Sequence, residues 1–281
     1  MYKFRPILKT LVWGTESWVL SGVPGSESVV AEGPDAGKTL SEVYGGEFPL
    51  LIKFIDAHKD LSIQVHPDDE LAARRHGCKG KTEMWYIIGA SEGAHLLAGL
   101  SKEITPEQYE RRVADGSIVE VLADHSVAPG DVFFLPAGRI HAICGGCYLA
   151  EIQETSDITY RIFDYNRPGL DGRPRQLHTE LARDAIDYTV YPQYRTEYEC
   201  VPDRPVEIVN CKHFVTSLFK ASAPAVINPA GDAFIVICAE GSATLGGTSL
   251  SAGEAVLFSP SDKEVFLIPA SGGVTLLTTH C

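Results

Sequence analysis

The chain has 281 residues, enough for one large domain or two smaller ones. Apolar residues make up 44% of it, which allows a buried core, and no window holds the long uncharged apolar run of a membrane-spanning helix. The formal net charge of −13 argues against nucleic-acid binding, because phosphate backbones bind clustered lysine and arginine. We therefore expect neither a nucleic-acid nor a membrane partner, and an anionic ligand would need a local basic pocket.

The opening MYKFRPILKTLVWG does not have the layout of a secretory signal peptide, since its apolar stretch is short and no small-residue cleavage site follows. The seven cysteines are odd in number and scattered, which is not typical of a disulfide framework. Both features predict a cytoplasmic protein.

Short β-like segments, broken by glycine, proline and aspartate, dominate the first two thirds of the chain. Many short strands at close spacing predict a sandwich or a barrel rather than a βαβ sheet. The predicted strands lie within residues 49–57, 61–66, 83–88, 93–100, 118–136, 141–154 and 158–165.

Three helical segments interrupt these strands, at residues 67–77, 105–116 and 178–188. The first has acidic residues at its front, basic residues at its back and Gly77 as its stop. The second has Thr105 as its N-cap, followed by Pro106 and by Gln108 three positions after the cap. The third has Thr179 as its predicted N-cap.

From about residue 196 the chain is again almost purely β-like, after a polar, proline-bounded stretch at 192–205 that we interpret as a linker. A faint internal echo relates residues 126–143 to residues 249–268. Both contain a small-residue turn, a glycine and an acid, an apolar strand, a proline, a polar turn and a strand. This echo predicts two related β-barrels. The predicted domains are residues 1–195 and 196–281.

The segment GDVFFLPAGRIH has the form G-x5-P-x-G-x2-H, with Gly130 and His141 as its ends. Its glycines and Pro136 supply two tight turns, and the histidine enters the following strand at a set offset. This pattern resembles the second signature of the cupin superfamily, whose small β-barrels hold a divalent metal. The resemblance implies a mainly β fold of two cupin-type, jelly-roll β-barrels, with a few short helices inserted in or flanking the first.

In a cupin, further metal ligands come from an upstream signature. The segment IQVHPD supplies Gln64 and His66, which point to one face of a strand because they are two positions apart. Glu83 lies in KTEMWY, again two positions from Lys81. A lone histidine on a strand is usually a hydrogen-bonded structural residue, but this combination favours a metal site. The implied ligand set is Gln64, His66, Glu83 and His141, which suits one zinc ion with an open coordination position.

The CGGC segment at 144–147 resembles a CxxC motif. A zinc ribbon needs two such pairs, and a redox CxxC is typically found at the start of a helix, whereas this region is predicted to be a strand. We therefore interpret it as a glycine-rich β-turn with incidental thiols.

Taken together, SIQVHPDD, KTEMWYII, PAGRIHAI and SDITYRIFDYNRPG resemble the type I mannose-6-phosphate isomerases in their short bacterial form. The resemblance is strong over residues 1–190 and looser beyond. It implies a zinc enzyme that interconverts mannose 6-phosphate and fructose 6-phosphate, with the four ligands named above. It also implies an active-site role for Arg161, in the YRIFDYNR segment. A sugar phosphate is therefore the expected partner.

This isomerisation moves a proton between C1 and C2, through a cis-enediol that carries negative charge on oxygen. Arg161 suits the developing charge or the phosphate, with a structural ion pair to Asp164 or Asp157 as the alternative reading. Lys81 would bind phosphate or, if burial lowers its pKa, transfer a proton; its alternative is an ion pair at the barrel rim. Arg167 is a weaker phosphate candidate, with a solvated loop position as its alternative.

Other questions stay open in the sequence. The general base is Lys81, Glu151 or a zinc-bound water. The second barrel has PSDKEV where the first has PAGRIH, so we predict that it binds no metal and supports the first barrel or a subunit contact. Either a monomer or a homodimer fits. Rival functions are another metal-dependent cupin enzyme, such as a dioxygenase, and a non-catalytic sugar-binding cupin.

Overall fold

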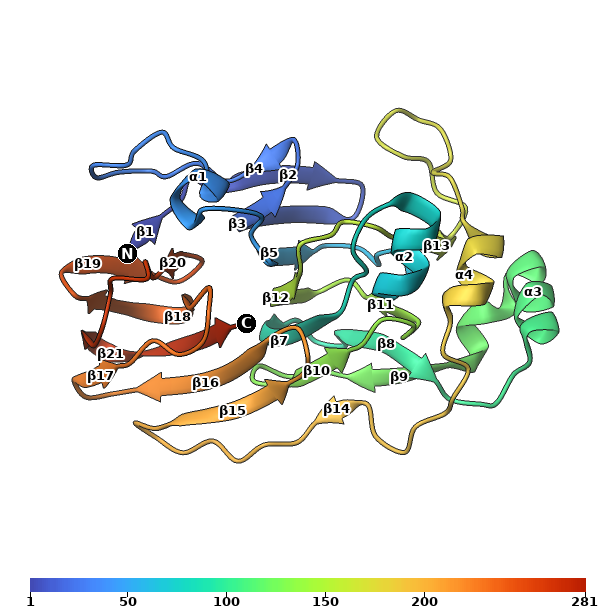
Figure 1. Ribbon diagram of the computed structural model, residues 1–281. Helices are drawn as coiled ribbons and strands as arrows, with labels where there is room; N and C mark the ends of the chain where they lie inside the picture. Colours follow the sequence, from blue (N-terminus) through green and yellow to red (C-terminus); the bar gives the residue numbers. More distant parts are fainter. The chain divides into compact units, whose positions relative to one another are not determined.

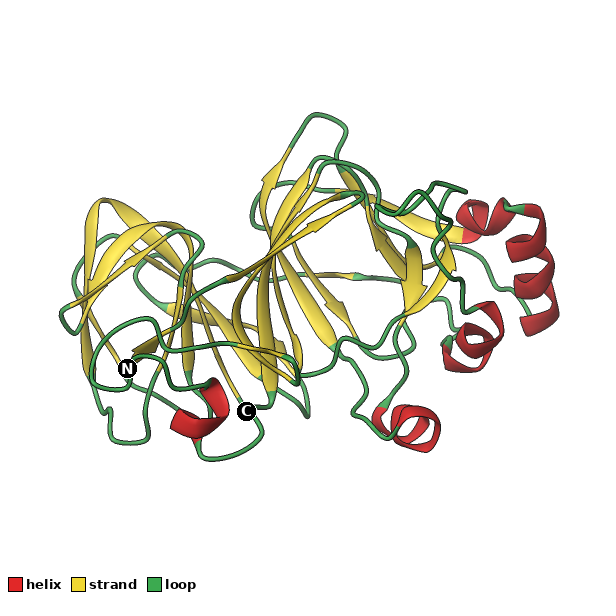
Figure 2. Ribbon diagram, turned by 90° about the horizontal axis from the view of Figure 1, so that it is seen from above, coloured by secondary structure: helices red, strands yellow, loops and turns green.

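Antiparallel β-strands make up 45% of the computed structural model, which describes residues 1–281, and helices make up 12%. Figure 2 shows the predominance of strands over the few short helices. The chain forms two compact units, one of residues Met1–Ile7, Ser17–Phe54 and Thr196–Cys281 and the other of Leu8–Glu16 and Ile55–Arg195. Two early segments thus belong to the same unit as residues 196–281. The functional division between residues 195 and 196 stays a prediction.

The unit that contains residues 55–195 is built on two antiparallel groups of strands (Figure 1). One is a five-stranded sheet in the order β13-β6-β11-β8-β9, with bounds Tyr160–Phe163, Ile63–Val65, His141–Ile143, His95–Leu100 and Leu122–Ser126. The other has β7 at its centre, paired with β10 on one side and β12 on the other, with bounds Glu83–Ala90, Val132–Leu135 and Cys147–Glu154. The short strand β14, Arg195–Thr196, lies beside β10.

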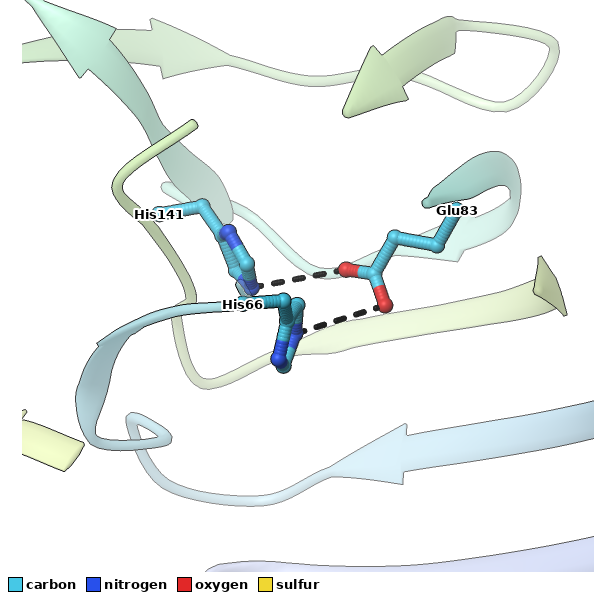
Figure 3. A group of neighbouring side chains, drawn as sticks. All are labelled: His66, Glu83 and His141. Carbon is cyan, nitrogen blue, oxygen red and sulfur yellow. Dashed lines mark ion pairs between the residues drawn. The ribbon is translucent and has the colours of Figure 1, made fainter. Parts of the chain in front are cut away.

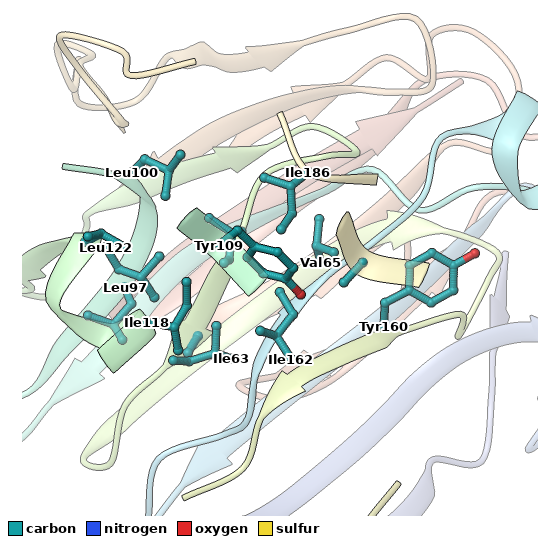
Figure 4. Packing of buried hydrophobic residues seen from close by; sticks show 14 of the residues in the cluster. Ile63, Val65, Leu97, Leu100, Tyr109, Ile118, Leu122, Tyr160, Ile162 and Ile186 are labelled. Carbon is teal, nitrogen blue, oxygen red and sulfur yellow. The ribbon is translucent and has the colours of Figure 1, made fainter. Parts of the chain in front are cut away.

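Residues of the five-stranded sheet alternate between two environments. Ile63, Val65 and Ile162 point to a hydrophobic cluster with Tyr109 and Ile118, which come from helical segments (Figure 4). The residues between them point the other way, because successive side chains of a strand lie on opposite faces. On that second face, Ala98 and Ile143 pack with Trp85 and Leu135 of the other strand group. The site residues described below lie on this inner face.

The helical layer comprises α2, α3, the 3₁₀ helix η1 and α4, with bounds Asp69–His76, Pro106–Asp115, Ser117–Val121 and Thr179–Ala185. The predicted capping box is confirmed, because Thr105 accepts from the Gln108 backbone and Gln108 accepts from the Thr105 N–H. Gly77 ends α2 in the left-handed conformation, as predicted.

Two details of the predicted elements were wrong. Residues 118–121 are helical rather than extended, and Ile118 and Val121 bury their side chains against the sheet from that conformation. The third helix begins at Thr179 with His178, not Thr179, in the N-cap position, and His178 makes no side-chain capping bond. Its imidazole is instead bonded to Arg161 of β13.

The other unit contains the whole of a sheet in the order β1-β20-β18-β21-β16-β15, with β17 added to β21 and β19 to β18. The bounds are Tyr2–Lys3, Ala255–Leu257, Ile235–Leu245, Val265–His280, Val215–Ala221, Pro205–Asn210, Ala225–Ile227 and Thr248–Ser251. It also holds β4, Ser26–Glu27, and α1, Leu40–Tyr44. Four strands have residues in both units: β2, Ile7–Leu11; β3, Gly14–Val23; β5, Leu50–Ala57; and β14.

The internal echo has a structural counterpart. Residues 126–143 run from the end of β9 through β10 to β11, and residues 249–268 run from β19 through β20 into β21. Gly130 and Gly253 occupy the same place before the second strand, and both have positive φ, at 97° and 85°. Only glycine adopts this conformation without steric cost, which explains the shared glycine–acid pair.

None of the helices combines the length and the apolar character that crossing a membrane requires.

Candidate metal centre

Three predicted site residues lie in one row across the five-stranded sheet. Gln64 of β6 is the register partner of His141 on β11 and of Arg161 on β13. Directly opposed residues on antiparallel strands have side chains on the same face, a few ångströms apart. The row therefore gathers an amide, an imidazole and a guanidinium on the inner face.

Glu83 reaches this row from the neighbouring strand group. It is the first residue of β7, where Leu135 and Gln153 are its partners on both sides. Glu83 Oε1 lies 3.4 Å from His141 Nε2, and Oε2 lies 3.6 Å from His66 Nε2 (dashed lines, Figure 3). One ligand atom from each of these residues lies within 4.8 Å of the others. All three side chains are buried, with exposed fractions of 2% or less.

The second nitrogen of each imidazole identifies its tautomer. His66 Nδ1 lies 2.8 Å from the carbonyl oxygen of Ile158, and His141 Nδ1 lies 2.8 Å from that of Arg139. A carbonyl oxygen accepts but cannot donate, so each Nδ1 carries the proton. Each neutral ring therefore directs the lone pair of Nε2 toward Glu83. Metal-binding histidines are typically held in this way.

Burial keeps His141 in its neutral form. Desolvation lowers its pKa to about 4, and the nearby Lys81 ammonium contributes in the same direction. Gln64 Nε2 lies 3.2 Å from His141 Nε2 and donates to it, which again requires a lone pair on that nitrogen. The imidazole is thus a ready electron-pair donor at neutral pH.

This donor set fits a divalent cation. Two nitrogen lone pairs and a carboxylate converge within a few ångströms in a water-poor interior, where mutually facing electron pairs repel. A cation placed among them converts that repulsion into attraction. The predicted ligands His66, Glu83 and His141 are therefore brought together. The amide of Gln64 also faces the group, but with its nitrogen, and an oxygen ligand would require a half-turn of the amide.

A buried ionic network adjoins the cluster. Lys81 Nζ lies 2.9 Å from Glu83 Oε2 and 3.7 Å from Glu151 Oε1. Trp85 Nε1 donates to Glu151 Oε2 at 2.9 Å. Burial by itself lowers the pKa of Lys81, but the two carboxylates outweigh it and raise the pKa above the usual lysine value. Lys81 is therefore an ammonium in this structure. Its neighbours do not favour the lowered pKa that proton transfer by Lys81 would need.

Arg161 lies at the edge of the same sheet. Its Nη1 donates to the carbonyl oxygen of Gln176 at 2.9 Å, and its buried Nε has no hydrogen-bond partner. Burial and the charge of Arg175 lower its pKa, but an arginine remains cationic at neutral pH. Asp164 forms its ion pairs with Arg167 and Arg175, so it does not form the ion pair with Arg161 that the sequence left open.

Those neighbours form a compact charged group at the base of the following loop. Arg175 donates to both Asp164 oxygens at 2.6 Å, and Arg167 donates to Oδ1 from Nε and Nη2 at 2.9 and 2.8 Å. Asp164 is 5% exposed. Arg167 is thus an ion-pair partner rather than the solvated loop cation considered from the sequence. With the neighbouring Arg161, the two arginines outnumber the single carboxylate, so this edge of the sheet is positively charged.

Some contacts of the site could not be read from residue types. The carbonyl oxygens of Ile158 and Arg139 carry no sequence signal, because every residue has one. No sequence pattern singles out His178, although it lies beside Arg161. Trp85 is buried like a core residue, and its indole N–H also donates to Glu151. The predicted CGGC turn is confirmed, with Gly145 and Gly146 as a turn between β11 and β12.

These features define a cupin-like β-barrel protein with a buried His–Glu–His group able to hold a metal. The comparisons agree. Residues 16–93 match the family model of the phosphomannose isomerase type I catalytic domain. Mannose-6-phosphate isomerase ManA of Bacillus subtilis is 32% identical over 268 residues, covering 85% of each chain. Probable mannose-6-phosphate isomerase GmuF of the same organism is 38% identical over 211 residues, covering 65% of this chain and 67% of the relative.

The fold comparison extends over the whole chain. A crystal structure of the mannose 6-phosphate isomerase from Bacillus subtilis superposes with a TM-score of 0.90 at 29% identity, covering 100% of this chain and 99% of the other. A putative mannosephosphate isomerase from Archaeoglobus fulgidus, at 17% identity and a TM-score of 0.79, shares the fold. The chain belongs to the type I mannose-6-phosphate isomerases, a family of enzymes.

Proposed function

We propose that this chain is a zinc-dependent aldose–ketose isomerase that interconverts D-mannose 6-phosphate and D-fructose 6-phosphate through a cis-enediol. The convergence of His66, Glu83 and His141 within 4.8 Å, beside Lys81 and Arg161, is the observation that carries the proposal. Family membership supports the substrate.

The donor set supports zinc in particular. Two imidazole nitrogens and one carboxylate oxygen are ligands that catalytic zinc prefers, with a further position for substrate or water. His66, Glu83, His141 and, after a half-turn of its amide, Gln64 would hold one ion per chain. When bound, zinc supplies Lewis-acid polarisation of the substrate carbonyl.

Charge balance supports the choice of substrate. Glu83, Glu151 and Lys81 together carry about one negative charge, so a divalent cation leaves the centre near +1. Arg161 and the arginines around Asp164 add positive charge at the adjoining sheet edge. A sugar phosphate brings one to two negative charges, which these groups compensate despite the net charge of −13 for the whole chain.

We assign the roles of the remaining residues from these contacts. Arg161, whose buried Nε makes no hydrogen bond, would stabilise the charge that develops on the substrate oxygens. Glu151 is our candidate for the base that moves a proton between C1 and C2. Lys81, held as an ammonium by Glu83 and Glu151, is our candidate donor to the substrate oxygens.

The experiment that tests the proposal is direct. The purified chain, loaded with zinc, is supplied with mannose 6-phosphate, and fructose 6-phosphate is measured with a coupled assay. Oxygen uptake is followed in the same sample, since a dioxygenase would consume oxygen. Formation of fructose 6-phosphate without oxygen uptake supports the isomerase. Binding without turnover would contradict it and favour a sugar-binding protein.

We further propose that residues 1–195 form the catalytic domain and residues 196–281 a supporting domain. The metal group lies entirely within residues 66–141, which supports the first assignment. Cytoplasmic location is part of the proposal, because all seven cysteines are free thiols, as in a reducing compartment. Either a monomer or a homodimer is compatible with it.

A further inference from the structure

Arg161 occupies an edge strand, which leaves part of its backbone in need of partners. β13 is the terminal strand of the order β13-β6-β11-β8-β9. On an edge strand, the outward-facing N–H and C=O groups have no neighbouring strand to bond with, and buried groups of this kind must be satisfied by other parts of the chain.

His178 satisfies both of these groups at Arg161. The Arg161 N–H donates to His178 Nδ1 at 3.1 Å, and the His178 N–H donates to the Arg161 carbonyl oxygen at 2.7 Å. In an antiparallel sheet, a residue points its N–H and C=O to the same side. The backbone N–H and C=O of Arg161 both face His178, so they point away from β6. Arg161 and its register partner Gln64 therefore form a pair that is not joined by backbone hydrogen bonds. In such pairs the Cα atoms approach to about 4.5 Å and the side chains are closest.

The same short segment also holds the guanidinium. Gln176, two residues before His178, accepts from Arg161 Nη1 at 2.9 Å. Residues 176–178 thus contact Arg161 at its backbone N–H, at its carbonyl oxygen and at its side chain. Together these contacts determine where the guanidinium lies relative to Gln64 and the metal group.

The His178 imidazole accepts the hydrogen bond from the Arg161 N–H and does not cap its own helix. It stands in the N-cap position of α4, where a side chain usually accepts from the first turn, yet it makes no capping bond. Its Nδ1 carries no proton, because that atom accepts the Arg161 N–H. We propose that His178 is a positioning residue for the isomerase reaction, which orients Arg161 through its unprotonated Nδ1. This inference rests on the proposed role of Arg161.

Protonation of His178 would break the contact, since Nδ1 would then carry a hydrogen facing another N–H. The titratable groups around the imidazole are Arg161 and Tyr160 of β13 and His76 of α2. Burial, Arg161 and His76 all lower the pKa of His178, so it accepts this bond at neutral pH. Activity should therefore fall on the acid side when His178 becomes charged.

The test uses zinc-loaded His178→Ala, His178→Asn and His178→Gln. An asparagine oxygen occupies nearly the place of Nδ1, whereas a glutamine amide reaches toward the place of Nε2. We expect His178→Ala and His178→Gln to lose about 10- to 100-fold in kcat, the usual cost of misplacing a catalytic group. We expect His178→Asn to recover most of the loss. Zinc content should equal that of the wild type in all three.

The pH profile separates positioning from simple stability. The ratio of His178→Asn to wild-type kcat should rise as the pH falls below the usual histidine range, because only the wild type loses its acceptor there. Zinc content is measured at each pH. Wild-type kcat in His178→Ala, or equal losses in the Asn and Gln variants, would overturn the inference. Arg161→Ala distinguishes the positioning role of His178 from the proposed role of Arg161. Full activity in that variant would overturn the role of Arg161 itself.

Discussion

His141 Nε2 lies 3.4 Å from Glu83 Oε1, and neither side chain is more than 1% exposed. These atoms come from different strand groups, β11 and β7, so the contact exists only in the folded barrel. The neutral imidazole presents a lone pair to a carboxylate, an arrangement that a shared cation stabilises. The first prediction follows from this pair.

Replacing His141 with alanine should abolish turnover and release the metal. The loss in metal affinity should exceed about 100-fold, because even the residues that support metal ligands contribute 10- to 100-fold. Metal content after dialysis and kcat/KM for mannose 6-phosphate are the measurements. His95→Ala, at the half-buried first residue of β8, is the control and should keep both. Retention of bound metal by His141→Ala would remove His141 from the ligand set.

Arg161→Ala should lose activity while keeping its metal. Removing a preorganised donor to developing negative charge costs about 100- to 1,000-fold in kcat. Arg161→Lys should recover only part of it, since an ammonium lacks the planar donor fork. The measurements are kcat from steady-state kinetics and the metal content of the same Arg161 variants. A variant that loses metal and activity together would indicate a structural role instead.

Glu151→Gln should keep the fold and the metal but slow proton transfer. Glutamine preserves the size of the side chain, and its carbonyl oxygen still accepts from Trp85 Nε1. A positioned base contributes about 100- to 10,000-fold, which is the expected fall in kcat. Exchange of the C2 hydrogen with solvent should fall in the same proportion. Unchanged exchange would assign the base to another group.

Asp164→Asn should destabilise the protein at neutral pH by about 2–3 kcal/mol, because Arg167 and Arg175 lose their charged acceptor. Although burial raises the pKa of Asp164, its two arginine partners outweigh it and lower the net value. The folded carboxyl therefore has a lower pKa than the unfolded one. Its stabilisation is complete above the unfolded value of about 4 and is lost as the pH falls through the folded value.

Urea unfolding at a series of pH values measures this difference. The difference in the free energy of unfolding between the wild type and Asp164→Asn should be constant near neutral pH and should vanish in acid. A gap that persists below the folded pKa would show that the carboxylate charge is not its source. Glu70→Gln, at a fully surface ion pair with Arg74, is the control and should change stability little at any pH.

Six of the seven cysteines, all but the half-buried Cys211, should react with a thiol reagent in two classes. Cys78, Cys200 and Cys281 are exposed and should react rapidly, whereas Cys144, Cys147 and Cys238 are buried. Burial raises the pKa of Cys147 to about 11 and that of Cys238 to about 12, so little thiolate forms at neutral pH. Stopped-flow labelling, before and after unfolding, counts both classes. Rapid reaction of Cys144 or Cys147 in the folded protein would contradict the interpretation of CGGC as a plain turn.

Local chemistry explains which elements could be predicted. The capping box at Thr105 and the glycine stop at Gly77 act through neighbours in sequence, so the pattern alone identifies them. Residues 118–121 differ because their apolar alternation also fits a helical turn that buries Ile118 and Val121. Only packing against the sheet chooses between the two. The N-cap of α4 is His178 and not the predicted Thr179 for a similar reason, because a tertiary contact with Arg161 holds His178 in place.

The sequence by itself determined three things: the strand alternation that turns Gln64 and His66 to one face, the turns that set the offset of His141, and the residue types that suit a metal. Tertiary structure alone decided the rest. It directs Lys81 to two carboxylates, which raise its pKa, and places His178 beside Arg161. Electrostatic effects depend on distances between atoms of remote segments, and those distances arise only when the sheets close around them.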